Sequence, residues 1–160
     1  MTGLNAYASI DEFKGQLDIE SEKPTDDVYI DELLERASRE FDGDTQHWFY
    51  GATQTRRYDV PHGRELELDA PLLTVTSLTN GDGTAIASTE YNLSPYNGVH
   101  KTCIKLNMTS AYYWAESLTT GIEAAISVAG TWGYVDRTAT DPQSAAVISN
   151  TTAAVLALAL

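Results

Sequence analysis

Residues 27–49 read DVYIDELLERASREFDGDTQHWF and contain the most regular pattern in the chain. Their apolar residues recur at the three- and four-residue intervals of one helix face: Ile30, Leu33, Leu34, Ala37, Phe41 and Trp48. Charged residues fill the positions between them, several at the i, i+4 spacing that supports an exposed face. We therefore predict an amphipathic helix from about Asp27 to about Phe49, ended by Gly51 and weakest at Asp42-Gly43-Asp44.

A shorter helix is predicted before it. Ser9 and Glu12 have the three-residue spacing of a capping box, in which the serine caps the helix and the glutamate bonds back to it. Residues 21–24 have turn composition and separate the two helices. Thr25 or Asp26 is then expected to cap the second helix.

Beyond Thr53 the apolar period changes from 3.6 to 2, which predicts strands. We expect Pro71 to interrupt this region and Asn80-Gly81-Asp82-Gly83 to form a tight turn. Residues 95–100 predict an exposed loop. The predicted strands cover residues 55–60, 65–69, 73–78, 84–87, 90–93, 103–106 and 122–129.

A last helix is predicted from Asp141-Pro142 to Leu160, because proline at the first helical position loses no hydrogen bond. The order of elements predicts an α+β fold with an N-terminal helix pair, a β-rich middle of short antiparallel strands, and a C-terminal helix that packs back on the first two. We expect a single domain, residues 1–160, whose parts are helical residues 1–52, a β-rich insert at 53–135 and the C-terminal helix at 141–160.

The chain is strongly acidic, with ten Lys and Arg against 23 Asp and Glu in 160 residues and a formal charge of −13. Nucleic acids and anionic membranes both attract cationic surfaces, so this excess disfavours either as a bound partner. It favours solubility, or adaptation to molar salt, in which repulsion between exposed charges is screened within about 3 Å.

Further classes are disfavoured by local features. Cys103 is the only cysteine, so an intramolecular disulfide is excluded. The N-terminus has neither a basic stretch nor an apolar run, so we expect no signal peptide. Residues 153–160 are apolar but fall short of the roughly 20 residues that span a bilayer. We expect a soluble protein without a membrane segment.

No motif for catalysis, a cofactor or a metal is recognised. The histidines His47, His62 and His100 stand apart, and no acidic turn has the spacing of a calcium loop. Glu65 and Glu67 share one face of a predicted strand, which indicates a solvated face but leaves open a glycosidase-like pair. We therefore predict no catalytic residue, no cofactor and no metal ligand.

Candidate interface residues come from three features. Arg56, Arg57 and Arg64 are the local cluster of positive charge, suited either to cross-strand pairing with Glu65 or Glu67 or to an acidic partner. Aromatic residues beside glycine suit core packing or an interface, and the apolar C-terminus needs a surface to cover it. The predicted interface residues are Arg56, Arg57, Arg64, Tyr96, Trp132, Tyr134, Val155, Leu156, Leu158 and Leu160.

The order of six segments along the chain is characteristic. They are DDVYIDELLERA at 26–37, TRRY at 55–58, APLLTVTSL at 70–78, EYNL at 90–93, VAGTWGY at 128–134, and the predicted helix at 141–160, which starts with proline and is rich in alanine. This order resembles the head–tail connector proteins of tailed phages. The resemblance covers nearly the whole chain and lies in the order of these motifs. Two departures are the long insert between Leu93 and Ile122 and a last helix without a polar tail.

The resemblance implies a structural virion protein and not an enzyme. Such a subunit would assemble in the host cytoplasm into a homo-oligomeric ring, commonly twelve-fold, in the neck of the virion. The ring would dock beneath the portal protein, extend the DNA channel without sequence-specific binding, and receive a stopper or tail-completion protein. Because acidic residues outnumber basic ones by 23 to 10 and occupy the outer faces of the predicted N-terminal helices as well as part of the strand region, we also predict a halophilic host, the alternative being an ordinarily acidic virion protein.

Two other functions remain open: a small carbohydrate-active or hydrolytic enzyme with paired carboxylates, and a binding module that uses the aromatic patches. The size of the protein in solution separates them, because an active monomer would favour the enzyme and a large ring the connector.

Overall fold

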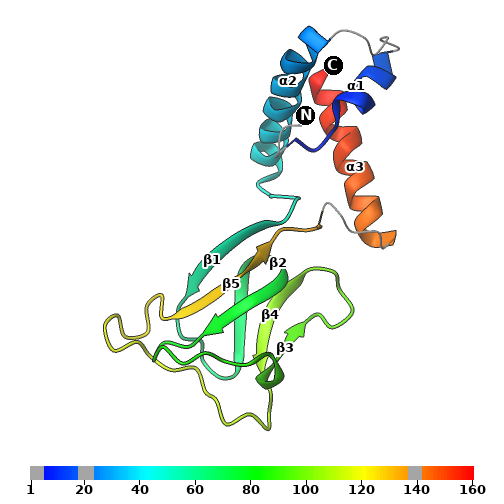
Figure 1. Ribbon diagram of the computed structural model, residues 1–160. Helices are drawn as coiled ribbons and strands as arrows, with labels where there is room; N and C mark the ends of the chain where they lie inside the picture. Colours follow the sequence, from blue (N-terminus) through cyan, green and yellow to red (C-terminus); the bar gives the residue numbers. More distant parts are fainter. Residues whose placement is uncertain (1–5, 18–23, 137–141) are drawn as a thin grey trace. The chain divides into compact units, whose positions relative to one another are not determined.

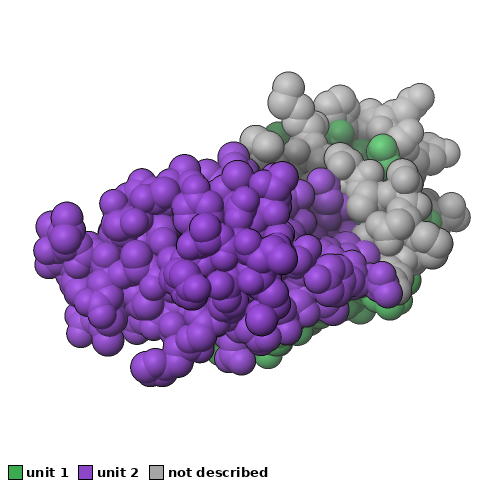
Figure 2. Space-filling view, turned by 90° about the horizontal axis from the view of Figure 1, so that it is seen from below, with its two compact units in different colours: residues 1–49, 137–160 green, residues 50–136 purple. Residues whose placement is uncertain are grey.

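The computed structural model describes residues 6–17, 24–136 and 142–160. The chain divides into two compact units (Figure 2): a helical unit of residues 1–49 and 137–160, and a β unit of residues 50–136. Helices lie at both ends of the sequence and a five-stranded antiparallel sheet in the middle. The C-terminal helix packs against the N-terminal helices, so the predicted α+β fold is confirmed.

The helical unit contains α1 (Ile10–Leu17), α2 (Pro24–Thr45) and α3 (Pro142–Ala159) (Figure 1). The predicted capping box is confirmed, because the Glu12 amide donates to Ser9 Oγ at 3.2 Å and the Ser9 amide donates to Glu12 Oε2 at 2.7 Å. Ile30, Leu34 and Ala37 are buried on the inner face of α2, as the apolar period predicted.

Both predicted ends of α2 are wrong. The helix begins at Pro24, so Thr25 and Asp26 lie inside it and not at its cap; proline suits the first turn, where its missing N–H has no partner to lose. The helix ends at Thr45 because Gln46 adopts the left-handed conformation, with φ of 57°. Trp48, predicted on the apolar face, therefore lies beyond the helix and is 59% exposed. The predicted cap Asp141 and most of the turn at 21–24 lie outside the described residues.

The β unit contains β1 (Ala52–Tyr58), β2 (Glu65–Thr79), a short 3₁₀ turn η1 (Ser88–Glu90), β3 (Tyr91–Ser94), β4 (Lys101–Leu106) and β5 (Ile126–Trp132). Their order across the sheet is β1-β5-β2-β4-β3. The long strand β2 pairs with β4 through its first half and with β5 through its second (Figure 1). It therefore joins the two halves of the sheet.

Pro71 does not separate two strands, contrary to prediction. It lies within β2 where the main partner changes from β4 to β5, and the register shifts on both sides of Leu72. A proline is tolerated at such an irregularity because its missing N–H interrupts no regular ladder. Its carbonyl still accepts a hydrogen bond from the Gly133 amide at 2.8 Å.

Other strand predictions need smaller corrections. The tight turn is confirmed: the Gly83 amide donates to Asn80 O at 2.9 Å, and Gly83 has φ of 84°. The predicted strand at 84–87 is reduced to one bridge between Thr79 and Ala85. The strand predicted from Ile122 begins at Ile126 instead.

The core of the β unit is formed by apolar residues from one face of the sheet and by Trp114 from a loop. Its fully or almost fully buried members include Leu66, Leu72, Leu78, Ile104, Ile126, Val128 and Trp132. None of the described helices is long and apolar enough to cross a lipid bilayer.

Candidate protein interface

Arg56 closes the edge of the β unit's core. Its guanidinium lies 4.9 Å from the centre of the Trp132 ring and pairs with Asp69 at 2.9 Å. Arg56 therefore pairs with Asp69 and not with either predicted partner; Glu65 pairs instead with Lys105 at 2.9 Å. Tyr58 Oη also donates to Asp69, at 2.5 Å.

The environment of Asp69 favours its charged form. Partial burial disfavours the carboxylate, but the hydrogen bond from Tyr58 and the positive charge of Arg56 outweigh burial, so the pKa of Asp69 is lowered. Burial and the contact with Asp69 raise the pKa of Tyr58. The three side chains therefore act as one structural cluster over Trp132.

Arg64 holds a loop. Its Nη1 donates to Asn107 O at 2.6 Å, and its Nη2 donates to Ser110 O at 3.3 Å. The guanidinium also lies 4.7 Å from the centre of the Tyr113 ring. Arg64 thus fixes the segment after β4, a role for which its position in the sequence gives no signal.

Asn80 anchors the same loop from the other side, and sequence reasoning found it only as a turn residue. The buried Asn80 side chain donates to Tyr113 O at 2.8 Å and accepts from the Ala115 amide at 2.9 Å. A Cβ on Gly81 would lie 2.1 Å from Ala115 O, so only glycine allows this approach. Beyond these anchors, Leu118 is 99% exposed.

Arg57 points to the opposite face of the sheet from Arg56 and is exposed. Cross-strand register places Arg57 in the last of three rows of directly opposed residues on β1, β5 and β2. A register shift in β2 separates the first row from the second. The rows are Thr53–Thr131–Thr74, Thr55–Ala129–Ser77 and Arg57–Ser127–Thr79. We call these nine residues the threonine face. Arg57 is the one charged residue among them, and each of the nine is exposed or half-buried.

The predicted aromatic residues divide between core and surface. Trp132 is 2% exposed and donates from Nε1 to Gln54 O at 3.1 Å, so it belongs to the core. Tyr134 is half-buried and packs edge-on against His100, with ring centres 5.1 Å apart. Tyr96 is 71% exposed in the predicted loop between β3 and β4.

The predicted C-terminal residues also divide. Val155 and Leu156 are buried in the helical unit, whereas Leu158 and Leu160 are 43% and 66% exposed. The end of α1, the start of α2 and the end of α3 lie together at one end of this unit (Figure 1). Among the described residues, these helix ends carry five exposed large apolar side chains, which we call the apolar end: Leu17, Val28, Tyr29, Leu158 and Leu160.

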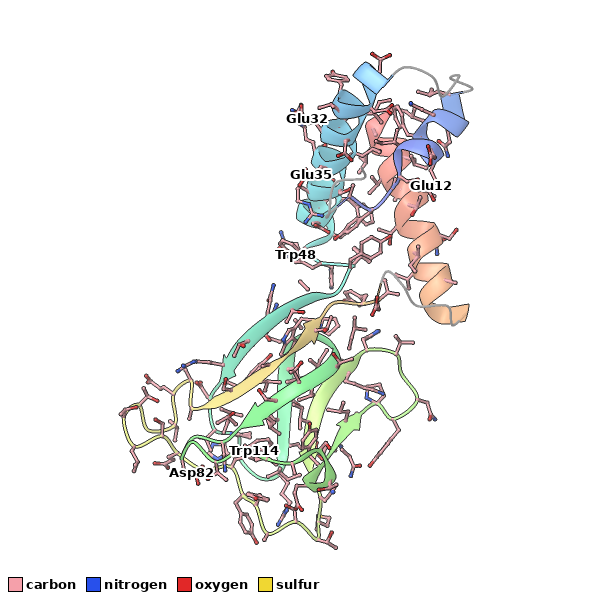
Figure 3. The ribbon with its side chains drawn as sticks, viewed as in Figure 1. Glu12, Glu32, Glu35, Trp48, Asp82 and Trp114 are labelled. Carbon is pink, nitrogen blue, oxygen red and sulfur yellow. The ribbon has the colours of Figure 1, made fainter. Side chains whose placement is uncertain are left out.

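An open groove of about 580 Å³ runs between α1 and α3, with Gly15 and Glu12 on one side and Ala145, Ile148 and Ala153 on the other. Glu12, at its rim, is labelled in Figure 3. The groove is lined mainly by small and apolar side chains.

A buried polar cluster lies at the opposite end of α2 and escaped sequence analysis, which treated Asp42 only as a weak point of the helix. Tyr7 Oη donates to Asp42 Oδ1 at 2.5 Å, and Arg39 pairs with Asp42 at 2.9 Å. Burial raises the pKa of Asp42 against the opposing effects of Tyr7 and Arg39, and burial together with Asp42 raises the pKa of Tyr7 to about 12. The cluster ties the segment before α1 to α2.

The titratable side chains that could support catalysis line an open pocket. Tyr58, Asp59, His62, Glu65 and Glu67 line an open pocket of about 530 Å³. Glu65 is held by Lys105. The described residues contain no group of three or more His, Cys, Asp or Glu placed to hold a metal ion.

Arg57 on the threonine face and the apolar end are thus the features best suited to contact another protein. No protein-family model matches the sequence, and no curated protein matches it significantly.

Proposed function

We propose that this chain is a structural subunit of a head–tail connector in a tailed virus, and that it acts as a homo-oligomeric ring. The observation that carries the proposal is the apolar end of the helical unit. Val28, Tyr29 and Leu160 are each at least 66% exposed there, in a chain whose charged residues are otherwise abundant. Exposed apolar groups gathered at one place are characteristic of protein contact surfaces.

The arrangement of the chain supports the same proposal. An N-terminal helix pair, a β-rich middle and a C-terminal helix that returns to the first helices is the architecture that the resemblance implies. The ring would dock on a portal protein, extend the DNA channel and receive a stopper or tail-completion protein. Its net charge of −13 would keep DNA from adhering during passage.

The test is the size and shape of the purified protein. Light scattering and negative-stain images, recorded from low salt to molar NaCl, should show a closed ring with a central hole, about twelve chains in mass, either alone or after addition of the virus's own portal protein. A chain that stays monomeric under all these conditions would refute the proposal. Hydrolysis of a glycoside by that monomer would favour the alternative function, a carbohydrate-active enzyme with paired carboxylates.

A further inference from the structure

The threonine face carries one positive charge and no negative charge, in a chain with a net charge of −13. None of the described residues of β1, of β5 or of 70–79 in β2 is Asp or Glu, although Glu65, Glu67 and Asp69 lie in the first part of the same β2. Seven of its nine members are Thr or Ser and one is Ala129. Three adjacent strands therefore present an exposed, acid-free surface.

This composition suits a surface that becomes buried. A carboxylate taken out of water without a partner costs several kcal/mol, whereas a threonine offers a methyl group and a hydroxyl that can donate to a partner. Threonine is favoured in strands by its β-propensity, but the first part of β2 carries Glu65, Glu67 and Asp69 at exposed positions, so the sheet itself does not exclude acids. Arg57 would then be the charge that a partner has to match.

We propose that the threonine face is the subunit contact of the ring, and that it docks against the outer face of α2 in a second copy of this chain. The proposal rests on the proposed function. Because one surface meets a different one, the contact is head-to-tail, and repetition of it closes a ring if the rotation between copies allows.

The outer face of α2 matches the threonine face in charge. It exposes Glu32, Glu35 and Glu40, two of which are labelled in Figure 3, with Arg36 among them. Their carboxylates can accept from Arg57 and from the threonine hydroxyls. A nucleic acid is a poorer occupant, because one arginine in nine positions offers little to a phosphate backbone.

The outer face of α2 also matches the threonine face in apolar character and in length. Its first turns carry Val28 and Tyr29, which are 66% and 71% exposed and could cover the threonine methyl groups. Glu32 and Glu40 are about 12 Å apart along the helix at 1.5 Å per residue. Thr53 and Arg57 are about 13 Å apart along β1 at about 3.3 Å per residue, so the two surfaces can align.

The test uses matched substitutions in the full chain, measured by sedimentation velocity at the salt concentration where the wild type assembles. Thr55→Glu adds one negative charge in the middle row of the face, on the edge strand β1. Thr89→Glu adds the same charge at an exposed position of η1, away from the face. We expect T55E and Arg57→Glu to weaken association at least tenfold, T89E to leave it unchanged, and Glu35→Arg to restore at least part of the association lost in R57E. Circular dichroism checks that each variant is folded.

The outcomes separate the two proposals. The proposed subunit contact is wrong if T55E assembles like the wild type, or if T55E and T89E weaken association equally. In either case, rings formed by the wild type would still support the connector proposal. Weakening by T55E and R57E without rescue by E35R would overturn α2 as the occupant. If the wild type forms no ring under any condition, both the connector proposal and the proposed subunit contact are refuted.

Discussion

Arg64 lies just before β2 and holds residues 107–112 through backbone carbonyls, with distances of 2.6 Å from Nη1 to Asn107 O and 3.3 Å from Nη2 to Ser110 O. We consider Arg64→Met, which keeps an unbranched apolar stem and removes every donor. The loop would then lose its support from Arg64 and keep the anchor at Asn80 and the hydrogen bonds from Asn107 to Thr89 O and Glu90 O.

The expected cost follows from the geometry. The short bond to Asn107 is a charge-assisted hydrogen bond, worth about 1.5–3 kcal/mol, while the contacts at 3.3 Å and beyond add little. Stacking on Tyr113 adds about 0.5–1 kcal/mol. Because Arg64 is only half-buried, water replaces part of this loss, and we expect about 2–3 kcal/mol. For a chain of this length that lowers the melting temperature by about 4–12 °C.

Two measurements check this prediction. A thermal melt gives the loss of stability, and hydrogen exchange locates it, because the Ser110 and Ala115 amides bond within the loop and to Asn80. The control is Arg57→Met in dilute protein, an exposed arginine of the same unit, for which we expect a change within about 0.5 kcal/mol. Equal melting temperatures for R64M and R57M, or faster exchange spread evenly over the sheet, would show that Arg64 does not organise this loop.

Four further predictions follow from the structure. Truncation before Val155 removes two buried side chains worth about 1.5–3 kcal/mol each and should unfold the helical unit, whereas Leu160→Gln should leave the circular dichroism melt unchanged; a truncated chain that folds and assembles like the full one would contradict this. Replacing Arg56 and Arg57 with Ala should weaken folding or docking but leave DNA affinity unchanged by fluorescence anisotropy, so a clear loss of DNA binding would exclude this assignment. Melting temperature should climb steadily into molar NaCl or KCl if the host is halophilic, and a flat or falling curve above about 0.2 M would rule that out. Burial raises the pKa of Asp42, so the stability that Asp42 contributes is fully present below the ordinary pKa of 3.8 and falls as pH rises through the folded-state pKa. The stability of the wild type relative to Asp42→Asn should therefore decrease from pH 3.5 upward. A difference that stays constant with pH would contradict this prediction.

Local patterns were enough for the elements themselves. The capping box at Ser9, the inner face of α2 and the turn at Asn80 depend on residues only a few positions apart, and the structure confirms all three. The α+β order followed from the change of apolar period near Thr53. Trp48 was misplaced because apolar spacing continues beyond Gln46, where a left-handed residue ends the helix, and residue spacing does not report backbone conformation.

Pairing across the sheet could not be predicted, because it joins residues far apart in the chain. The register of β5 against both β1 and β2 puts Arg56 on the core side and Arg57 on the exposed side, although the two are neighbours in sequence. The same register assembles the threonine face from three separate segments.

The sequence by itself therefore determined the order of helices and strands, the acidity of the chain and its content of arginine near residue 56. Only the tertiary structure decided the partner of each charged side chain: Arg56 with Asp69, Arg64 with backbone carbonyls, and Asp42 with Tyr7. The physical reason is range. Helix and turn preferences act over a few residues, whereas the desolvation and hydrogen bonding that select an ion's partner depend on which distant segments the packed core brings beside it.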